Sequence, residues 1–105
     1  MASAAEKIIK YLKIPEWIQD AAKKLFTSKK FGDIKYGDAR DTKPADAAKE
    51  FGLENVADKK IVEQIFSLIF SKNNQEKIDD TLRTHFAGRD AKDVWLAELM
   101  GKMVG

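Results

Sequence analysis

Residues that could do chemistry are few in this 105-residue sequence, and the only histidine is His85. Histidine is the commonest general base, but this one lies beside an apolar stripe, which favours a place at the edge of a packed helix face. The stripe recurs every four residues and consists of Ile78, Leu82 and Phe86. The chain has no cysteine, and no serine stands at a recognisable catalytic spacing from the histidine. We therefore expect no catalytic residues and no enzyme, with a small enzyme or ligand carrier that uses His85 as a second alternative.

The acidic residues do not follow the spacing of a known metal site or of a catalytic carboxylate pair. Asp33, Asp38 and Asp41 lie close in sequence, but their spacing differs from that of the twelve-residue calcium loop. Asp79 and Asp80 are adjacent, so on a helix their side chains point about 100° apart. No glycine-rich phosphate loop and no metalloprotease helix motif occurs. The sequence therefore predicts neither a metal nor a cofactor.

The compartment is indicated by apolar runs and by the missing cysteines. No uninterrupted apolar run approaches the roughly eighteen residues of a transmembrane helix. The start, MASAAEKIIK, lacks the long apolar run of a secretory signal. A cysteine-free chain also fits a reducing compartment. We expect a soluble intracellular protein, in the cytoplasm or inside an organelle, that is not secreted and has no transmembrane segment.

The formal charge is +2, from 19 basic and 17 acidic residues, so no global field indicates a nucleic-acid or membrane partner. The lysines are unevenly spread, because residues 1–31 hold seven of them against three acids. Acids nevertheless interrupt the basic face over 15–27, whereas a helix at a membrane surface keeps a mainly cationic polar face. Peripheral membrane contact through the basic N-terminal helices is therefore disfavoured.

The stretch 59–72, KKIVEQIFSLIFSK, carries the densest apolar pattern in the chain. At about 100° per residue its apolar side chains spread over an arc of roughly 200°. A helix with so wide an apolar face needs cover on more than one side. The pattern predicts a central hydrophobic helix over about 55–73 and burial of seven side chains: Ile61, Val62, Ile65, Phe66, Leu68, Ile69 and Phe70.

Start and stop signals divide the remaining sequence into shorter helices. Ser3 and Glu6 have the spacing of a capping box, which marks the start of a first helix. Pro15 ends that segment and opens a second helix that should reach Thr27. Gly52 is the expected left-handed terminator of a short helix from 43 to 51.

Further breaks complete the predicted architecture. Asn73 and Asn74 predict a break before a fifth helix, which Gly88 ends, and Asp90 caps a sixth. Two aromatic-Gly-Asp triplets predict turns in an irregular Gly/Asp-rich loop at 28–43. We expect an all-α fold, a single compact bundle of about five or six helices, with residues 1–105 forming one helical domain.

One short stretch, Ala47-Ala-Lys-Glu-Phe51-Gly52-Leu53, resembles the first helix and turn of helix-turn-helix DNA-binding domains. The resemblance implies a helix-turn-helix-like element at 44–72. The sequence departs from the family at Asp58, where an apolar anchor is expected, and the helix that would read bases is the hydrophobic one over 55–73. A nucleic-acid-binding domain is therefore the first alternative function, with phosphate contacts from Lys23, Lys24, Lys29, Lys30, Lys59 and Lys60.

The C-terminal segment 91–104 holds more apolar surface than one packing face needs. Tryptophan and methionine are favoured at protein interfaces, because each contributes much contact area. We weigh this interface against a helix that merely covers the central one. The leading prediction is a non-enzymatic protein–protein interaction module or a small accessory subunit of a larger assembly. Its interface residues are Trp95, Leu99, Met100 and Met103, with Trp17 from the second helix.

Overall fold

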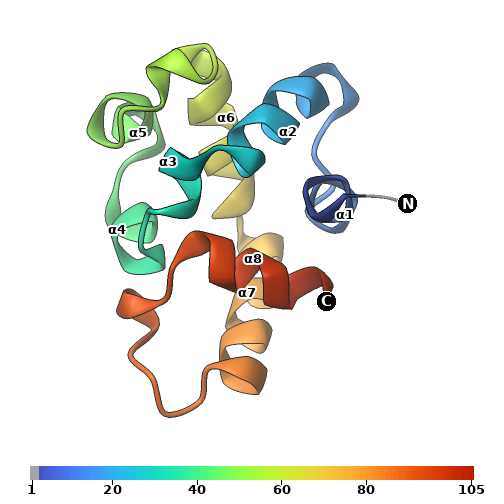
Figure 1. Ribbon diagram of the computed structural model, residues 1–105, viewed down its shortest axis with the longest axis vertical. Coiled ribbons are helices and arrows are strands. Elements are labelled where there is room, and N and C mark those ends of the chain that lie inside the picture. Colours follow the sequence, from blue (N-terminus) through green and yellow to red (C-terminus); the bar gives the residue numbers. More distant parts are fainter. Residues whose placement is uncertain (1–2) are drawn as a thin grey trace.

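The computed structural model describes residues 3–105 and confirms the all-α fold, since no strand occurs within them (Figure 1). The α-helices of this part of the chain are α1 (Ala4–Tyr11), α2 (Gln19–Thr27), α3 (Lys29–Gly32), α4 (Tyr36–Asp41), α5 (Pro44–Glu50), α6 (Lys59–Ile69), α7 (Lys72–His85) and α8 (Leu96–Val104). Three short 3₁₀ turns accompany them: η1 (Glu16–Ile18), η2 (Leu53–Asn55) and η3 (Ala91–Asp93).

Several helix ends follow the local signals in the sequence. The Ser3 hydroxyl accepts a hydrogen bond from the Glu6 amide at 3.2 Å, as an N-terminal cap should. Gly52 has a φ of 65°, the left-handed conformation expected after α5. The Asp58 carboxylate accepts from the Lys60 amide at 2.8 Å and starts α6. These ends are set by residues within a few positions of the ends themselves.

Helix α6 carries the aromatic centre of the core. Its residues Val62, Ile65, Phe66 and Ile69 are buried, and the other three predicted core residues, Ile61, Leu68 and Phe70, are half-buried. The Phe66 ring lies 6.1 Å from each of the rings of Phe31, Phe51 and Phe70. One side chain thus joins α6 to α3 and to the end of α5, and aromatic pairs of this kind stabilise beyond the area they bury.

The predicted break at Asn73 and Asn74 is wrong. Helix α6 ends at Ile69, the chain turns at Phe70 and Ser71, and both asparagines lie in the first turn of α7. The expected helix over 55–73 is therefore shorter, because the first residues of that range belong to η2 and to the turn capped by Asp58.

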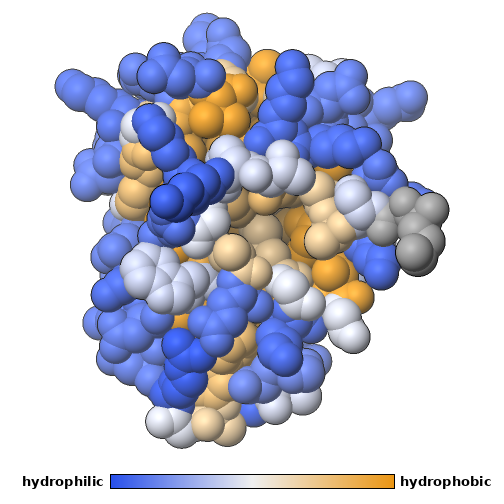
Figure 2. All heavy atoms as spheres, viewed as in Figure 1, coloured by the Kyte–Doolittle hydropathy of each residue, from blue (hydrophilic) through white to orange (hydrophobic). Residues whose placement is uncertain are grey.

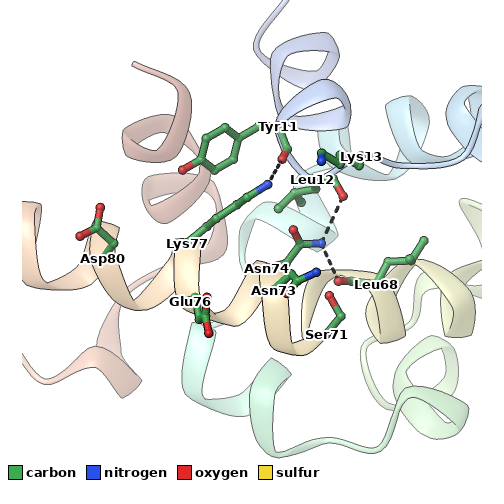
Figure 3. A pocket seen from close by; sticks show the side chains of 10 residues that line it. All are labelled: Tyr11, Leu12, Lys13, Leu68, Ser71, Asn73, Asn74, Glu76, Lys77 and Asp80. Carbon is green, nitrogen blue, oxygen red and sulfur yellow. Dashed lines mark hydrogen bonds between the residues drawn. The ribbon is translucent and has the colours of Figure 1, made fainter.

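The Asn74 side chain, in the first turn of α7, bonds to the ends of two other helices (Figure 3). The residue is 5% exposed, and its amide nitrogen donates to the carbonyl oxygens of Leu12 at 3.2 Å and Leu68 at 2.8 Å. Both carbonyls belong to helix ends, where backbone donors are fewer, and the Leu68 carbonyl also accepts from the Ser71 amide at 3.1 Å. Beside it, the Lys77 ammonium donates to the Tyr11 carbonyl at 2.6 Å and lies 4.8 Å from the centre of the Tyr11 ring. Side chains of α7 thus close the C-terminal end of α1.

The predicted irregular loop at 28–43 is wrong in part, because it contains α3 and α4. Gly32 lies in α3 and Gly37 in α4, so neither glycine makes the turn that its triplet suggested. A Cβ added to Gly37 would lie 2.8 Å from both Cα and Cβ of Lys92 in η3. Gly37 is therefore a site of close helix approach, which local sequence does not reveal.

Substitution of Asn74 tests its double role. We expect Asn74→Ala to lower the free energy of unfolding by about 2–4 kcal/mol, because it leaves the buried Leu12 carbonyl without a protein donor. Asn74→Asp keeps the shape but sets a carboxylate against two carbonyl oxygens, so its loss should be larger. Urea unfolding measures both. Asn73→Ala, at the exposed neighbouring position, should stay within about 0.5 kcal/mol of the parent. An Asn74→Ala protein as stable as the Asn73→Ala protein would contradict the role.

Two glycine substitutions should act in opposite directions. Gly37→Ala should destabilise the protein by about 1–3 kcal/mol, because the new Cβ meets the backbone of η3. Gly101→Ala in α8 meets no atom within 4 Å and should stabilise by about 0.5–1 kcal/mol through helix propensity. Thermal unfolding of both proteins gives the sign of each change. A stabilised Gly37→Ala protein would show that α4 and η3 are not in close contact.

Candidate functional site

The C-terminal segment does not form one helix from Ala91 to Val104. It divides into η3 and α8, and the two residues between them are extended. The Tyr36 amide donates to the Val94 carbonyl at 2.7 Å, and the Leu96 amide donates to the Ile34 carbonyl at 2.8 Å. This antiparallel bridge pairs Lys35 with Trp95. It removes Trp95 from the helix and fixes its backbone against the segment between α3 and α4.

Trp95 lies at the surface, with 43% of the residue exposed. The Lys35 ammonium lies 5.3 Å from the centre of the indole ring and 3.8 Å from the Asp93 carboxylate. A cation over an aromatic face is attracted by the ring's electron density. The indole is thus held on one side by a lysine that is itself paired, and its exposed remainder is free to contact another molecule.

An open groove of about 480 Å³ lies beside this tryptophan and is here called the Trp95 groove. Its apolar part comes from Trp95, Ile34 and Phe51, and its charged part carries two cations and two anions. The lining residues are Lys30, Asp33, Ile34, Lys35, Asp38, Phe51 and Trp95. Such a surface combines an exposed aromatic ring with two cationic and two anionic side chains, whose formal charges cancel.

The other predicted interface residues divide between core and surface. Leu99, Met100 and Met103 are buried in the core, so the exposed apolar helix face expected for them does not exist in this chain on its own. The physical reason is that α8 packs against α1, α3 and α7, which together cover its apolar side. Trp17 is 68% exposed on η1. The structure therefore does not bring the five residues together.

The six lysines of the nucleic-acid alternative lie on α2, α3 and the first turn of α6. The Lys23 ammonium bonds to the Glu6 carboxylate at 2.7 Å, and this contact lowers the pKa of Glu6 and raises that of Lys23. Lys30 donates to the Gly52 carbonyl at 3.3 Å, beside the turn between α5 and α6. Lys24, Lys29, Lys59 and Lys60 are exposed. Beyond its first turn, α6 exposes only Gln64 and Ser67, which leaves few side chains for reading bases.

His85 ends α7 and is exposed. Phe86, the next residue, is buried in the core, so the histidine stands at the edge of the packed face. In the part of the chain that the structure describes, no three His, Cys, Asp or Glu side chains are close enough to hold a metal ion. Within the same residues, no helix has the length and apolar character needed to cross a membrane.

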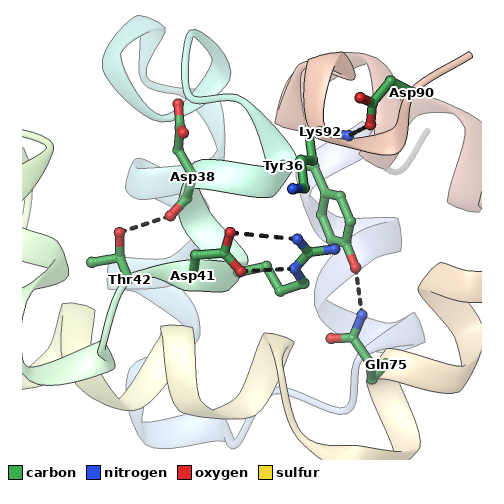
Figure 4. A network of polar contacts seen from close by, with 8 residues as sticks. Tyr36, Asp38, Asp41, Thr42, Gln75, Asp90 and Lys92 are labelled. Atoms are coloured by element: carbon green, nitrogen blue, oxygen red, sulfur yellow. Dashed lines mark hydrogen bonds and ion pairs between the residues drawn. The ribbon is translucent and has the colours of Figure 1, made fainter.

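A polar network joins α4 to α7 (Figure 4). The buried Tyr36 hydroxyl accepts a hydrogen bond from the Gln75 amide of α7, and the Arg40 guanidinium lies 5.5 Å from the Tyr36 ring centre. Arg40 donates to the Asp41 carboxylate at 3.0 Å, which lowers the pKa of that carboxyl. Burial raises the pKa of Tyr36 above its ordinary value. The network ties α4 to α7 just after the bridge that holds Trp95.

Two of the seven residues that line the Trp95 groove were predicted as site residues from the sequence, Trp95 as a protein contact and Lys30 as a phosphate contact of the nucleic-acid alternative, and the other five were not. Lys35 and Ile34 come to Trp95 through pairing with residues sixty positions away, and Phe51 comes through the turn at Gly52. The only local signal was the repeated aromatic-Gly-Asp triplet, which supplies Asp33 and Asp38.

Comparison of the chain with protein-family models, with curated proteins and with solved structures gives no match. The function must therefore be inferred from the residues of this chain.

The raised pKa of Tyr36 predicts a loss of stability in alkali. The unfolded chain releases the phenol proton near pH 10, before the folded protein does, so the contribution is full below that pH and is lost as pH rises through the folded pKa. Urea unfolding of the parent and of Tyr36→Phe, from about pH 8 to above pH 10, should show a steeper decline for the parent. Equal declines would mean that the phenol is not protected by burial.

Proposed function

We propose that this protein is a non-enzymatic protein–protein interaction module, an adaptor or small accessory subunit, and that the Trp95 groove binds its partner. The single observation that carries the proposal is the exposed indole of Trp95 on a backbone that the rest of the fold holds in place. Tryptophan is the residue type most enriched among those that dominate binding energy at interfaces.

The rigidity of the anchor supports this role. Two backbone hydrogen bonds flank Trp95, and Lys35 restrains its ring. An anchor that is already ordered loses little conformational entropy when a partner binds, so more of the contact energy appears as affinity. A flexible loop tryptophan would lose much of that gain.

The chemistry of the groove defines the partner. Phe51 and Ile34 offer apolar contact for one inserted side chain, and the charged lining consists of Asp33, Asp38, Lys30 and Lys35. A peptide segment with one bulky apolar residue between an acidic and a basic residue satisfies all three features. The groove is small, so we expect a modest, reversible interaction rather than an obligate one.

Affinity purification with matched variants tests the proposal. We expect Trp95→Ala to weaken binding of the partner at least about thirtyfold, because a buried interface tryptophan contributes about 2 kcal/mol or more. The partner is first captured from the native source with the parent protein, and its affinity is then measured by titration.

Trp17→Ala is the control, since it removes the more exposed of the two tryptophans at a site far from the bridge in sequence. It should leave the affinity unchanged. Far-ultraviolet circular dichroism of each variant should match the parent. Retention of every partner by a folded Trp95→Ala protein would reject the proposal.

A further inference from the structure

A second surface lies between α1 and α8, whose ends come together on one side of the molecule (Figure 1). It is an open groove of about 610 Å³, here called the basic groove. The side chains that line it are of two kinds only, cationic and apolar. They are Lys7, Lys10, Tyr11, Lys102, Met103 and Val104, with Gly105 at one end.

The charged side chains of the basic groove are all cationic. Lys7 and Lys10 stand on α1, Lys102 stands on α8, and none of the three forms an ion pair within residues 3–105. The nearest acid on α1, Glu6, is bound to Lys23 at 2.7 Å, and no acidic side chain lines the groove. Because these lysines stand on two helices that contact each other and line one groove, together they attract an anion.

The apolar part of the groove is only partly exposed. Tyr11 is 37% exposed, Val104 is half-buried and Met103 is 8% exposed. Figure 2 shows the molecule from the side seen in Figure 1, with hydrophobic residues visible between the hydrophilic residues that cover much of this face. A membrane-binding helix exposes a broad face of bulky apolar groups that reach the acyl region, whereas only Tyr11 of these three side chains is exposed. So limited an apolar surface suits contact with the side chains of a partner.

We propose that the basic groove binds an acidic amphipathic helix of a partner protein. A groove between two packed helices can hold a third helix. Apolar residues of the bound helix would contact Tyr11, Met103 and Val104. Because lysines stand on both edges, the partner helix carries carboxylates on both sides of its apolar stripe. Lys7 and Lys10 are three residues apart, which matches acids three or four residues apart on the partner.

This surface is independent of the Trp95 groove, since no residue lines both. The two proposals can therefore fail separately. Trp95→Ala should leave binding at the basic groove unchanged, and substitution of the three lysines should leave binding at the Trp95 groove unchanged.

The test uses the full chain and a synthetic helical peptide of about four turns, with leucines along one face and glutamates on both edges of that face. Nuclear magnetic resonance titration should shift the backbone amides of Tyr11, Met103 and Val104, and binding should weaken as salt rises. Reversal of charge at all three positions, Lys7→Glu, Lys10→Glu and Lys102→Glu, should weaken binding about tenfold or more.

Two controls separate a specific site from general attraction of charge. Reversal at Lys43, Lys49 and Lys59, three exposed lysines outside the groove, should change affinity much less. A peptide with glutamine in place of each glutamate should not bind. Equal losses from the two triple variants would overturn the proposal. So would binding to phosphatidylserine vesicles without binding to the acidic peptide, since that result assigns the surface to lipid.

Discussion

One side-chain amide closes the ends of two helices, and the placement of α1 against α6 and α7 depends on it. Asn74 donates to a carbonyl at the end of α1 and to another in the last turn of α6. A helix end buried without such a donor is costly, because its carbonyls have lost water and gained nothing. Helix α1 in turn forms one wall of the basic groove, so a polar contact in the interior positions a surface far from it in sequence.

The second organising contact is the bridge between Lys35 and Trp95. It joins the middle of the chain to the segment before α8 with two hydrogen bonds, and the close approach of Gly37 to Lys92 lies directly beside it. Around it the interior is filled by rings, with Phe66 contacting three others. The helices here are short, so these long-range contacts rather than helix propensity must supply much of the order.

The sequence predicted features that depend on near neighbours. The helical class, the cap at Ser3 and the left-handed turn at Gly52 follow from residues within one turn, and the structure agrees with them. It did not predict features that depend on distant partners. Asparagine is common where helices break, but the Asn74 side chain donates to carbonyls of two other segments. Glycine is common in turns, but Gly37 allows the backbones of α4 and η3 to come close. On a helical wheel Trp95 shares a face with Leu99, but in the structure Trp95 pairs with Lys35 and lies before the helix begins.

Helix α8 connects the two surfaces. Trp95 is the residue before its first turn, and Lys102 to Val104 form its last turn, so roughly 10–14 Å along the helix axis separates them at 1.5 Å per residue. Two polypeptides held at the ends of so short a rod would be confined to one small volume. The effective concentration of one polypeptide at the other would be on the order of millimolar, even if the two do not bind each other when free in solution. The protein would then promote contact between two polypeptides that interact weakly by themselves.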